Sequence, residues 1–144
     1  MKYIVLLGRV LYSSIFVMAG MTHFSAQTIG YAAAQGVPFA SIAVPLSGVM
    51  AIFGGLSVAL GYKAKYGAWV LALFLLPVTV MLHNFWAVTD PMMAQMQQVM
   101  FMKNLTMLGT ALLISYFGSG PASLDALLSA HQIQRADGRQ AVTA

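Results

Sequence analysis

Four long apolar runs constrain the fold of this 144-residue chain more than any other feature. The runs cover about 3–24, 42–62, 66–86 and 99–117. About 20 helical residues cross the hydrocarbon core of a membrane, so each run is long enough, or nearly so, to span it. The runs are continuous rather than alternating, which argues against a β-barrel. The sequence therefore predicts an all-α protein, a four-helix transmembrane bundle, in one domain over residues 1–120.

The composition excludes several other classes of protein. Apolar residues make up 60% of the chain and charged residues only 7%, with a mean hydropathy of +0.80. A soluble domain has about 25% charged residues, and a disordered chain needs low hydrophobicity and high charge. The absence of cysteine excludes disulfides, thiolate metal sites and thiol catalysis. The net charge of +4 is too widely spread to form a nucleic-acid-binding patch.

Lysines and arginines outside the apolar runs fall on one predicted side of the membrane. Lys2 precedes the first run, Lys63 and Lys65 lie between the second and third, and Arg135 and Arg139 lie in the tail. The connections at about 25–41 and 87–98 contain no lysine or arginine. Because positive loops stay in the cytoplasm, we expect both termini there. The first run is expected to be retained rather than cleaved as a signal peptide, since it is long and interrupted by arginine.

Residues 121–144 are predicted to form a short cytoplasmic C-terminal tail. The sequence Gly-Ser-Gly-Pro from Gly118 stops the fourth helix. A short amphipathic segment follows, in which Leu124, Leu127 and Leu128 would face the membrane and His131 would face water. Disorder is expected beyond Arg135.

Small residues in the second run predict where another helix packs. They recur every four positions, at Ser47, Ala51, Gly55 and Ala59. That spacing places them on one helical face, where the backbone of a neighbouring helix can approach closely. Small residues are also common in membrane helices without such a role.

Arg9 lies about two turns into the first run, where an arginine is costly unless it is paired or reaches water. Asp125 follows the fourth run on the same predicted side. We expect an Arg9–Asp125 ion pair that clamps this end of the bundle, with snorkelling of Arg9 to the interface as the alternative.

Polar side chains from three of the runs gather at the opposite end of the predicted bundle. The candidates are His23, His83, Asn84, Trp86, Lys103 and Asn104. Polar groups at this depth tend to face the bundle interior or a water-filled cavity. Hydrogen-bond donors and groups that titrate near neutrality suit an apolar ring with oxygen substituents, such as a quinone head group. The alternatives are an interfacial anchor for Trp86, a snorkelling cation for Lys103, interhelical hydrogen bonds for the two asparagines, and interface positions for the histidines.

A methionine-rich segment precedes the fourth run. Its five methionines are Met92, Met93, Met96, Met100 and Met102. Thioethers suit Cu(I), so Met93 and Met96 are candidate copper ligands. The spacing of four is also that of one apolar helical stripe, and we favour this interpretation. No catalytic residue is predicted, because the sequence holds no nucleophile motif, paired acid or cofactor motif.

These residues together resemble the DoxX family of small bacterial membrane proteins over roughly residues 4–127. The resemblance is carried by Gly8-Arg9, Ala19-Gly20-Met21-Thr22-His23-Phe24, Gly54-Gly55-Leu56 with Gly61, His83-Asn84-Phe85-Trp86, Lys103-Asn104-Leu105, and Gly118-Ser119-Gly120-Pro121 with Ser123-Leu124-Asp125. The family often has glutamate where this chain has Ala51, so no role of that carboxylate is carried over. It also often has lysine or arginine where this chain has His23.

The resemblance implies a multi-pass protein of the bacterial inner membrane. It further implies association with quinone-linked redox systems, as the small subunit of an oxidoreductase such as thiosulfate:quinone oxidoreductase, or with complexes that handle oxidative stress. We therefore expect a quinone-linked membrane subunit or quinone-binding module that is not catalytic alone. Its expected partners are the lipid bilayer, a redox subunit or a second copy of the chain, and no nucleic acid. The alternatives are a structural or assembly subunit and a protein that binds a small apolar ligand or a metal.

Overall fold

The computed structural model describes the backbone of residues 2–143 and the side chains of residues 2–135. Within that part the chain forms six α-helices, one short 3-10 helix and no strand. The elements are α1 (Lys2–Thr22), α2 (Ala26–Ala34), α3 (Ala40–Leu60), α4 (Ala64–Leu82), η1 (Phe85–Ala87), α5 (Pro91–Phe117) and α6 (Leu124–Thr143). Helices α1, α3, α4 and α5 are long and apolar enough to cross a membrane. The predicted all-α fold with four membrane-spanning helices is therefore confirmed.

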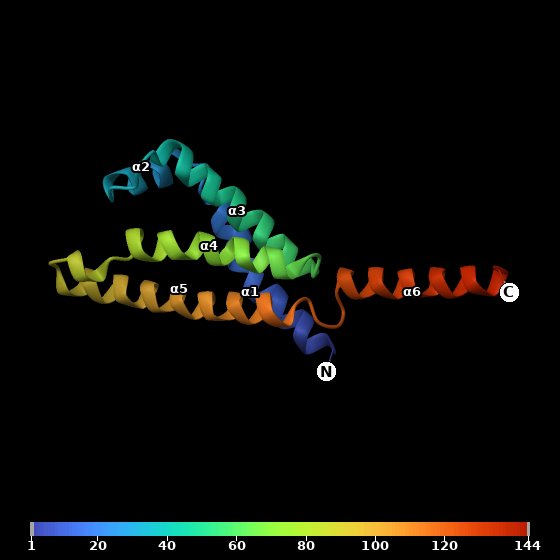
Figure 1. The fold of residues 1–144 in the computed structure, drawn as a ribbon. Helices are drawn as coiled ribbons and strands as arrows, with labels where there is room; N and C mark the ends of the chain where they lie inside the picture. Colours follow the sequence, from blue (N-terminus) through green and yellow to red (C-terminus); the bar gives the residue numbers. More distant parts are fainter. Residues whose placement is uncertain (1, 144) are drawn as a thin grey trace.

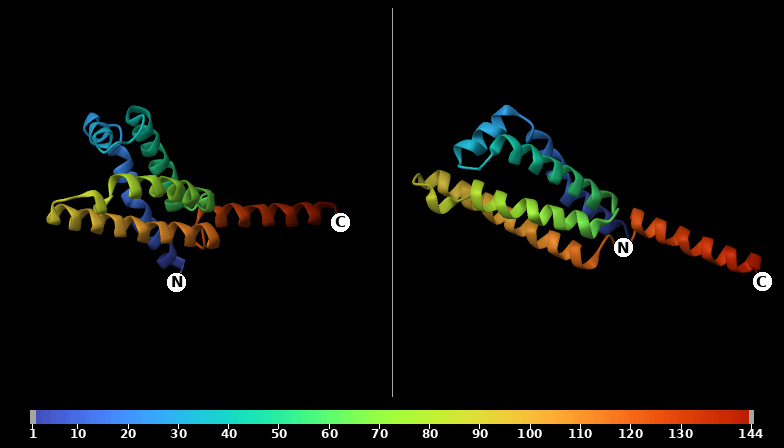
Figure 2. Two further views of the ribbon diagram at one scale, coloured as in Figure 1. Left: turned by 60° about the vertical axis from the view of Figure 1, so that its left-hand side comes forward. Right: turned by 45° about the horizontal axis from the view of Figure 1, so that its top comes forward.

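The four long helices pack in the order α1, α3, α4 and α5, and α4 and α5 lie side by side (Figure 1). Figure 2 shows the same arrangement from two further directions. We call the end that carries Lys2, Lys63 and Lys65 the basic end, and the end that carries His23 and His83 the histidine end. Helix α2 and η1 lie at the histidine end, whereas the N-terminus and the start of α6 lie at the basic end (Figure 1).

Glycines bring the backbones of neighbouring helices into contact. A Cβ atom added to Gly20 of α1 would lie 2.9 Å from the carbonyl oxygen of Gly48, and one added to Gly48 would lie 2.8 Å from that of Gly20. On the next face of α3, a Cβ atom on Gly54 would lie 3.1 Å from the carbonyl oxygen of Gly67 in α4. The fully buried Ala51 lies between these two contacts. Close packing of this kind holds helices together where lipid supplies no hydrophobic driving force.

Aromatic side chains fill the centre of the bundle. The rings of Phe16 in α1 and Phe74 in α4 meet edge to face, with 6.1 Å between their centroids. Tyr12 packs on Phe16, and its hydroxyl donates a 3.0 Å hydrogen bond to the carbonyl of Met107 in α5. One part-buried hydrogen bond thus joins the first and last spans.

Two connections differ from the sequence prediction. Helix α5 begins at Pro91 rather than near residue 99, because Pro91 is favourable in the first helical turn and the Asp90 carboxylate accepts a 2.8 Å hydrogen bond from the Met93 N–H. The connection at 25–41 contains α2, which was not predicted. Ser25 caps the start of α2, and Gly36 follows its end with a positive φ of 81°.

The basic end is closed by hydrogen bonds from Arg9, which is only 4% exposed. Its Nη1 donates to the carbonyl of Ser119 at 2.5 Å, and its Nη2 donates to that of Ala122 at 2.6 Å. The Asp125 carboxylate instead accepts from the Lys63 N–H at 3.0 Å and from the Ser119 hydroxyl. Arg9 and Asp125 are therefore linked through Ser119 rather than by the direct ion pair that we expected. The reason is that the guanidinium donates its hydrogen bonds to two loop carbonyls instead of to the carboxylate.

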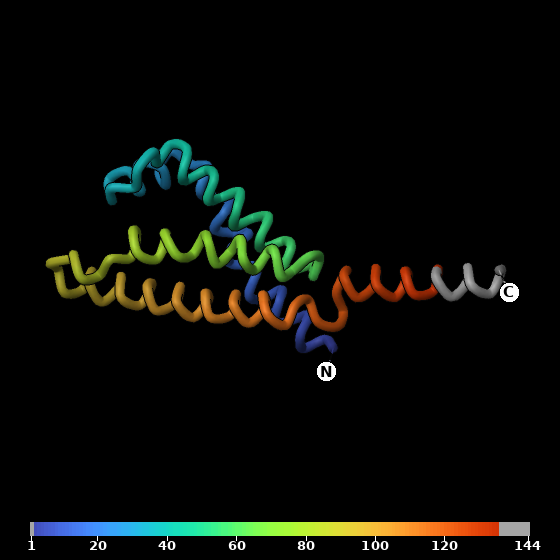
Figure 3. Tube along the Cα trace, in the orientation of Figure 1, coloured from blue at the N-terminus to red at the C-terminus, as the bar shows by residue number. Residues whose placement is uncertain are grey.

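Helix α6 leaves the bundle at the basic end and extends away from it (Figure 3). The side chains of Leu127 and Leu128 are 63% and 51% exposed, so the bundle does not cover the apolar stripe of this helix. The disorder expected beyond Arg135 concerns residues whose side chains lie outside the described part of the chain, and it stays a prediction.

Candidate functional site

The histidine end holds a cavity of about 210 Å³ between α2, α3 and α4, with His23 in its wall. Most of its wall is apolar, and the lining residues in chain order are His23, Thr28, Tyr31, Ala32, Val37, Pro38, Ala43, Val44, Ser47, Pro77, Val78, Met81 and Leu82. The short helix α2 supplies one wall, His23 reaches the cavity from the turn directly after α1, and Pro77 reaches it from the second half of α4. Helix α2 closes this side of the cavity because it packs beside α3.

His23 is held in one orientation by Ser47. Its Nδ1 lies 2.8 Å from the Ser47 Oγ, and that hydroxyl donates a 2.7 Å hydrogen bond to the carbonyl of Val44. A serine hydroxyl has a single proton, so the Ser47 oxygen must accept from His23. A neutral His23 therefore carries its proton on Nδ1 and presents Nε2 as an acceptor. The imidazole also contacts Phe74, with 5.8 Å between the ring centroids.

His83 belongs to a different group of side chains, at the junction of α4 and α5. Its Nδ1 donates a 2.8 Å hydrogen bond to the Oε1 of Gln97, since an amide oxygen can only accept. Nearby, the rings of Phe85, Trp86 and Phe101 meet edge to face, with centroids 5.2 to 5.8 Å apart. These contacts fix η1 on the first turns of α5.

The six predicted ligand-binding residues do not lie together in the structure. His23 lines the cavity, and the other five do not. Asn84 is half-buried beside His83, and Trp86 is 59% exposed in the aromatic group. Asn104 is only 5% exposed and lies on the same stripe of α5 as Gln97 and Phe101, by its spacing of seven and three residues.

Lys103 does not join either group. One residue along a helix turns the side chain by about 100°, so Lys103 lies away from the buried face that carries Asn104. Its side chain is exposed, and its Nζ donates a 3.3 Å hydrogen bond to the sulfur of Met100 on its own helix. The predicted quinone ligands therefore do not form one pocket around His83 and Lys103.

The sequence analysis missed the role of Ser47 and the wall formed by α2. The spacing of Ser47 predicts only a small packing residue, although a serine about two turns into a membrane helix is also a hydrogen-bonding group. Helix α2 has a recognisable start in Ser25 and Thr28, whose hydroxyls lie 2.9 Å apart, and a recognisable end in Gly36. With nine residues, α2 is too short to be recognised as a membrane span, so the sequence pattern did not distinguish it from a connecting segment.

The methionine segment forms the first turns of α5 rather than a loop. Met93 and Met96 are 47% and 52% exposed, and they lie in the first two turns of α5. Within the described residues, no group of three or more histidine, aspartate or glutamate side chains is arranged to hold a metal ion. A copper site formed by these methionines stays a prediction.

The sequence profile of the DoxX family matches residues 4–84, which is more than half of the chain. The chain belongs to the DoxX family. It is 33% identical over 127 residues to the inner membrane protein YqjF of Escherichia coli strain K12, with 87% of this chain and 92% of the relative covered. It is 27% identical over 125 residues to the inner membrane protein YphA of the same strain, with 85% and 88% covered. No solved structure matches the chain.

This DoxX protein is accordingly an integral protein of the inner membrane, as the four apolar helices and both relatives support. Every residue that lines the His23 cavity lies within the stretch matched by the family profile, whereas Lys103 and Asn104 lie outside it. The names of the two relatives specify a membrane and no ligand.

Proposed function

We propose that this DoxX protein is the quinone-linked membrane subunit of a redox system and that the quinone head group binds in the His23 cavity. The observation that carries the proposal is the His23–Ser47 pair, a hydrogen-bonded pair with a defined tautomer in the wall of a mostly apolar cavity. An apolar ring with oxygen substituents needs this combination: apolar walls for the ring, and one hydrogen-bonding group for an oxygen.

The cavity has a suitable size for one substituted ring. Its volume of about 210 Å³ exceeds the ~150 Å³ of an apolar cavity known to hold benzene. Val44 and Val78 offer flat aliphatic contacts, and Met81 can adapt to the shape of a ring. Tyr31, 46% exposed, lies where a head group would enter from the lipid.

The residues of the chain can bind, orient and exchange a proton with such a ring. A neutral His23 would accept a proton on Nε2 from a ring hydroxyl, and a protonated His23 would donate from Nε2 to a ring oxygen. Ser47 keeps the proton on Nδ1 in both states and so directs this exchange to Nε2. A bound quinone would supply the electron-carrying chemistry, and a partner subunit or its cofactor would deliver or remove the electrons.

The positive-inside rule places the basic end in the cytoplasm, and with it both termini. The His23 cavity would then lie near the opposite face of the membrane. Proton exchange at His23 would take place on that face.

Two histidine variants at the same end of the bundle test the site. Each histidine has one side-chain partner, Ser47 for His23 and Gln97 for His83. We expect His23→Ala to weaken the binding of a short-chain quinone to the purified protein at least tenfold, measured by calorimetric titration, and His83→Ala to leave it unchanged. Loss of binding only in His83→Ala would place the ligand at the other group, and unchanged binding in both variants would refute the proposal.

A structural or assembly subunit is the second candidate function. It is favoured by α6, which extends from the bundle with Leu127 and Leu128 uncovered and could contact another protein. Replacing Leu127 and Leu128 by serine would then abolish the recovery of a partner complex from membranes, while the quinone titration would show no binding to the intact chain.

A further inference from the structure

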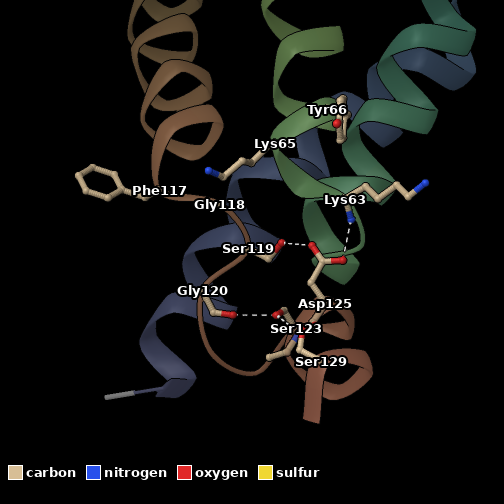
Figure 4. Close-up of a pocket in the computed structure, with 11 residues that line it drawn as sticks. Lys63, Lys65, Tyr66, Phe117, Gly118, Ser119, Gly120, Ser123, Asp125 and Ser129 are labelled. Atoms are coloured by element: carbon tan, nitrogen blue, oxygen red, sulfur yellow. Dashed lines mark hydrogen bonds between the residues drawn. The ribbon is translucent and has the colours of Figure 1, made fainter. Parts of the chain in front are cut away.

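The basic end contains a second cavity, of about 410 Å³, that the proposed function does not use. The α3–α4 turn, the first turn of α4, the end of α5 and the first turns of α6 surround it (Figure 4). Its lining residues in chain order are Lys63, Lys65, Tyr66, Phe117, Gly118, Ser119, Gly120, Ser123, Asp125, Ala126 and Ser129. We propose that this cavity binds the phosphate of an anionic membrane lipid.

The charged groups in and next to the cavity carry a net positive charge. The Asp125 carboxylate accepts hydrogen bonds from the Lys63 N–H and the Ser119 hydroxyl (Figure 4), and the Arg9 guanidinium donates to the Ser119 carbonyl. Arg9 and Asp125 thus compensate each other in charge. The two lysine ammonium groups remain to attract an anion.

Of the two lysines, Lys65 has its side chain closer to the loop that forms one wall of the cavity. Its side chain extends along the loop, where its Cε would lie 3.1 Å from a Cβ atom added to Gly118 (Figure 4). The ammonium of Lys63 lies 5.7 Å from the centre of the Tyr62 ring, and its flexible side chain can swing toward the cavity. We therefore assign the main phosphate contact to Lys65 and a weaker contact to Lys63.

The surroundings of the cavity favour a lipid over a soluble phosphate. The cavity lies where α4 begins and α5 ends, at the expected membrane boundary, and basic pockets at such positions attract anionic head groups. Tyr66 and Phe117 are 74% and 75% exposed at its rim, as aromatic residues at the interface are. From Tyr66, an exposed stripe continues along α4 through Trp69 and Leu73, which are 53% and 58% exposed. This stripe offers a surface for an acyl chain next to the head group.

The test is a titration of the purified full-length protein in a neutral detergent, followed by native mass spectrometry. The probes are phosphatidylglycerol, phosphatidylcholine and inorganic phosphate. We expect phosphatidylglycerol to bind more tightly than phosphatidylcholine, and inorganic phosphate not to compete with it. Lys65→Gln should weaken the binding of phosphatidylglycerol about fivefold, and Lys63→Gln should weaken it less.

Lys2→Gln is the matched control, because Lys2 carries the same charge at the same end but does not line the cavity. It should leave the binding of phosphatidylglycerol unchanged, and Lys65→Arg should retain it. Trp69→Ala should weaken lipid binding if the acyl chain follows the α4 stripe. An equal loss in Lys2→Gln and Lys65→Gln, equal affinities for the two lipids, or competition by inorganic phosphate would each overturn the proposal. None of these results depends on the quinone titration.

Discussion

Arg9 and Ser119 lie 110 positions apart in the sequence, and the Arg9 guanidinium donates a 2.5 Å hydrogen bond to the Ser119 carbonyl. The same guanidinium binds the carbonyl of Ala122, while the Ser119 hydroxyl binds Asp125. The loop between α5 and α6 is thus fastened to α1 from one side and to the α3–α4 turn from the other. All five long helices, α1, α3, α4, α5 and α6, are therefore connected at this point.

Replacing Arg9 should therefore destabilise the bundle more than removing a surface charge. Arg9→Ala leaves the carbonyls of Ser119 and Ala122 without their donor, so we expect a loss of about 3–5 kcal/mol in the free energy of unfolding. The midpoint of unfolding in sodium dodecyl sulfate measures the loss, with Lys2→Ala as the control. Arg9→Lys should recover only part of it, because an ammonium cannot match the two-pronged geometry of a guanidinium. Equal stability of Arg9→Ala and Lys2→Ala would contradict the role of the loop carbonyls.

Exchanging the charges of Arg9 and Asp125 should not restore stability. In a direct ion pair, Arg9→Glu combined with Asp125→Arg would rescue either single variant. Here the guanidinium faces carbonyl oxygens, and a glutamate in its place would be repelled by them. We expect the double variant to be at least as unstable as Arg9→Glu alone in the same unfolding measurement, and rescue would indicate a direct pair.

Asp125 should make the stability of the bundle depend on pH in the acidic range. Hydrogen bonds from the Lys63 N–H and the Ser119 hydroxyl hold the pKa of this carboxyl below its usual value, and Arg9 adds to the effect. A group whose pKa is lowered by folding stabilises the fold above its unfolded pKa of about 4, and this contribution is lost as the pH falls through the folded pKa.

The measurement compares the wild type with Asp125→Asn between pH 7 and pH 2.5. We expect the wild type to be the more stable at pH 7 and the difference to shrink below about pH 4, where the carboxyl in the unfolded chain becomes protonated. A difference that stays constant over this range would show that the charge of Asp125 does not contribute.

Gly48 should tolerate alanine poorly, although alanine is the better helix former. A Cβ atom at this position would lie 2.8 Å from the Gly20 carbonyl oxygen and 2.8 Å from the Cβ of His23. We expect Gly48→Ala to cost about 1–3 kcal/mol through forced separation of α1 and α3. Gly109→Ala in α5 is the control, because nothing lies within 4 Å of its added Cβ atom, and it should be neutral or slightly stabilising.

The tautomer of His23 can be measured directly. Because Ser47 donates to the Val44 carbonyl, its oxygen requires a proton on the His23 Nδ1. We expect nitrogen NMR of histidine-labelled protein to show neutral His23 protonated on Nδ1 in the wild type. In Ser47→Ala this preference should disappear, whereas His83 should keep its signal in both proteins. A proton on Nε2 in the wild type would invalidate the direction of proton exchange that we propose.

The four spans were predictable because each is a local property of the sequence. A run of about 20 apolar residues has few alternatives to a membrane helix, whatever its neighbours are. Of the small residues predicted to share one face of α3, Gly55 does lie close to α1, whereas the closest backbone contacts are made by Gly48 and Gly54 beside that face. Two helix boundaries were less predictable, because α2 and the first turns of α5 depend on the caps Ser25 and Asp90 rather than on hydrophobicity.

The site was less predictable than the fold. Sequence position could not indicate which of the predicted polar residues face each other. The helical rotation that turns Lys103 away from Asn104, and the crossing of α1 and α3 that brings His23 to Ser47, are consequences of packing between distant segments.

The sequence alone determined that this protein is helical, where its membrane spans lie and to which family it is similar, because hydrophobicity and motif order are read along the chain. Only the tertiary structure decided what the buried polar groups do. A buried hydrogen-bonding group must find a partner, and the partner is set by which backbone comes within about 3 Å in the folded bundle. Arg9 therefore binds two loop carbonyls and His23 binds Ser47, and neither contact is written in the order of the residues.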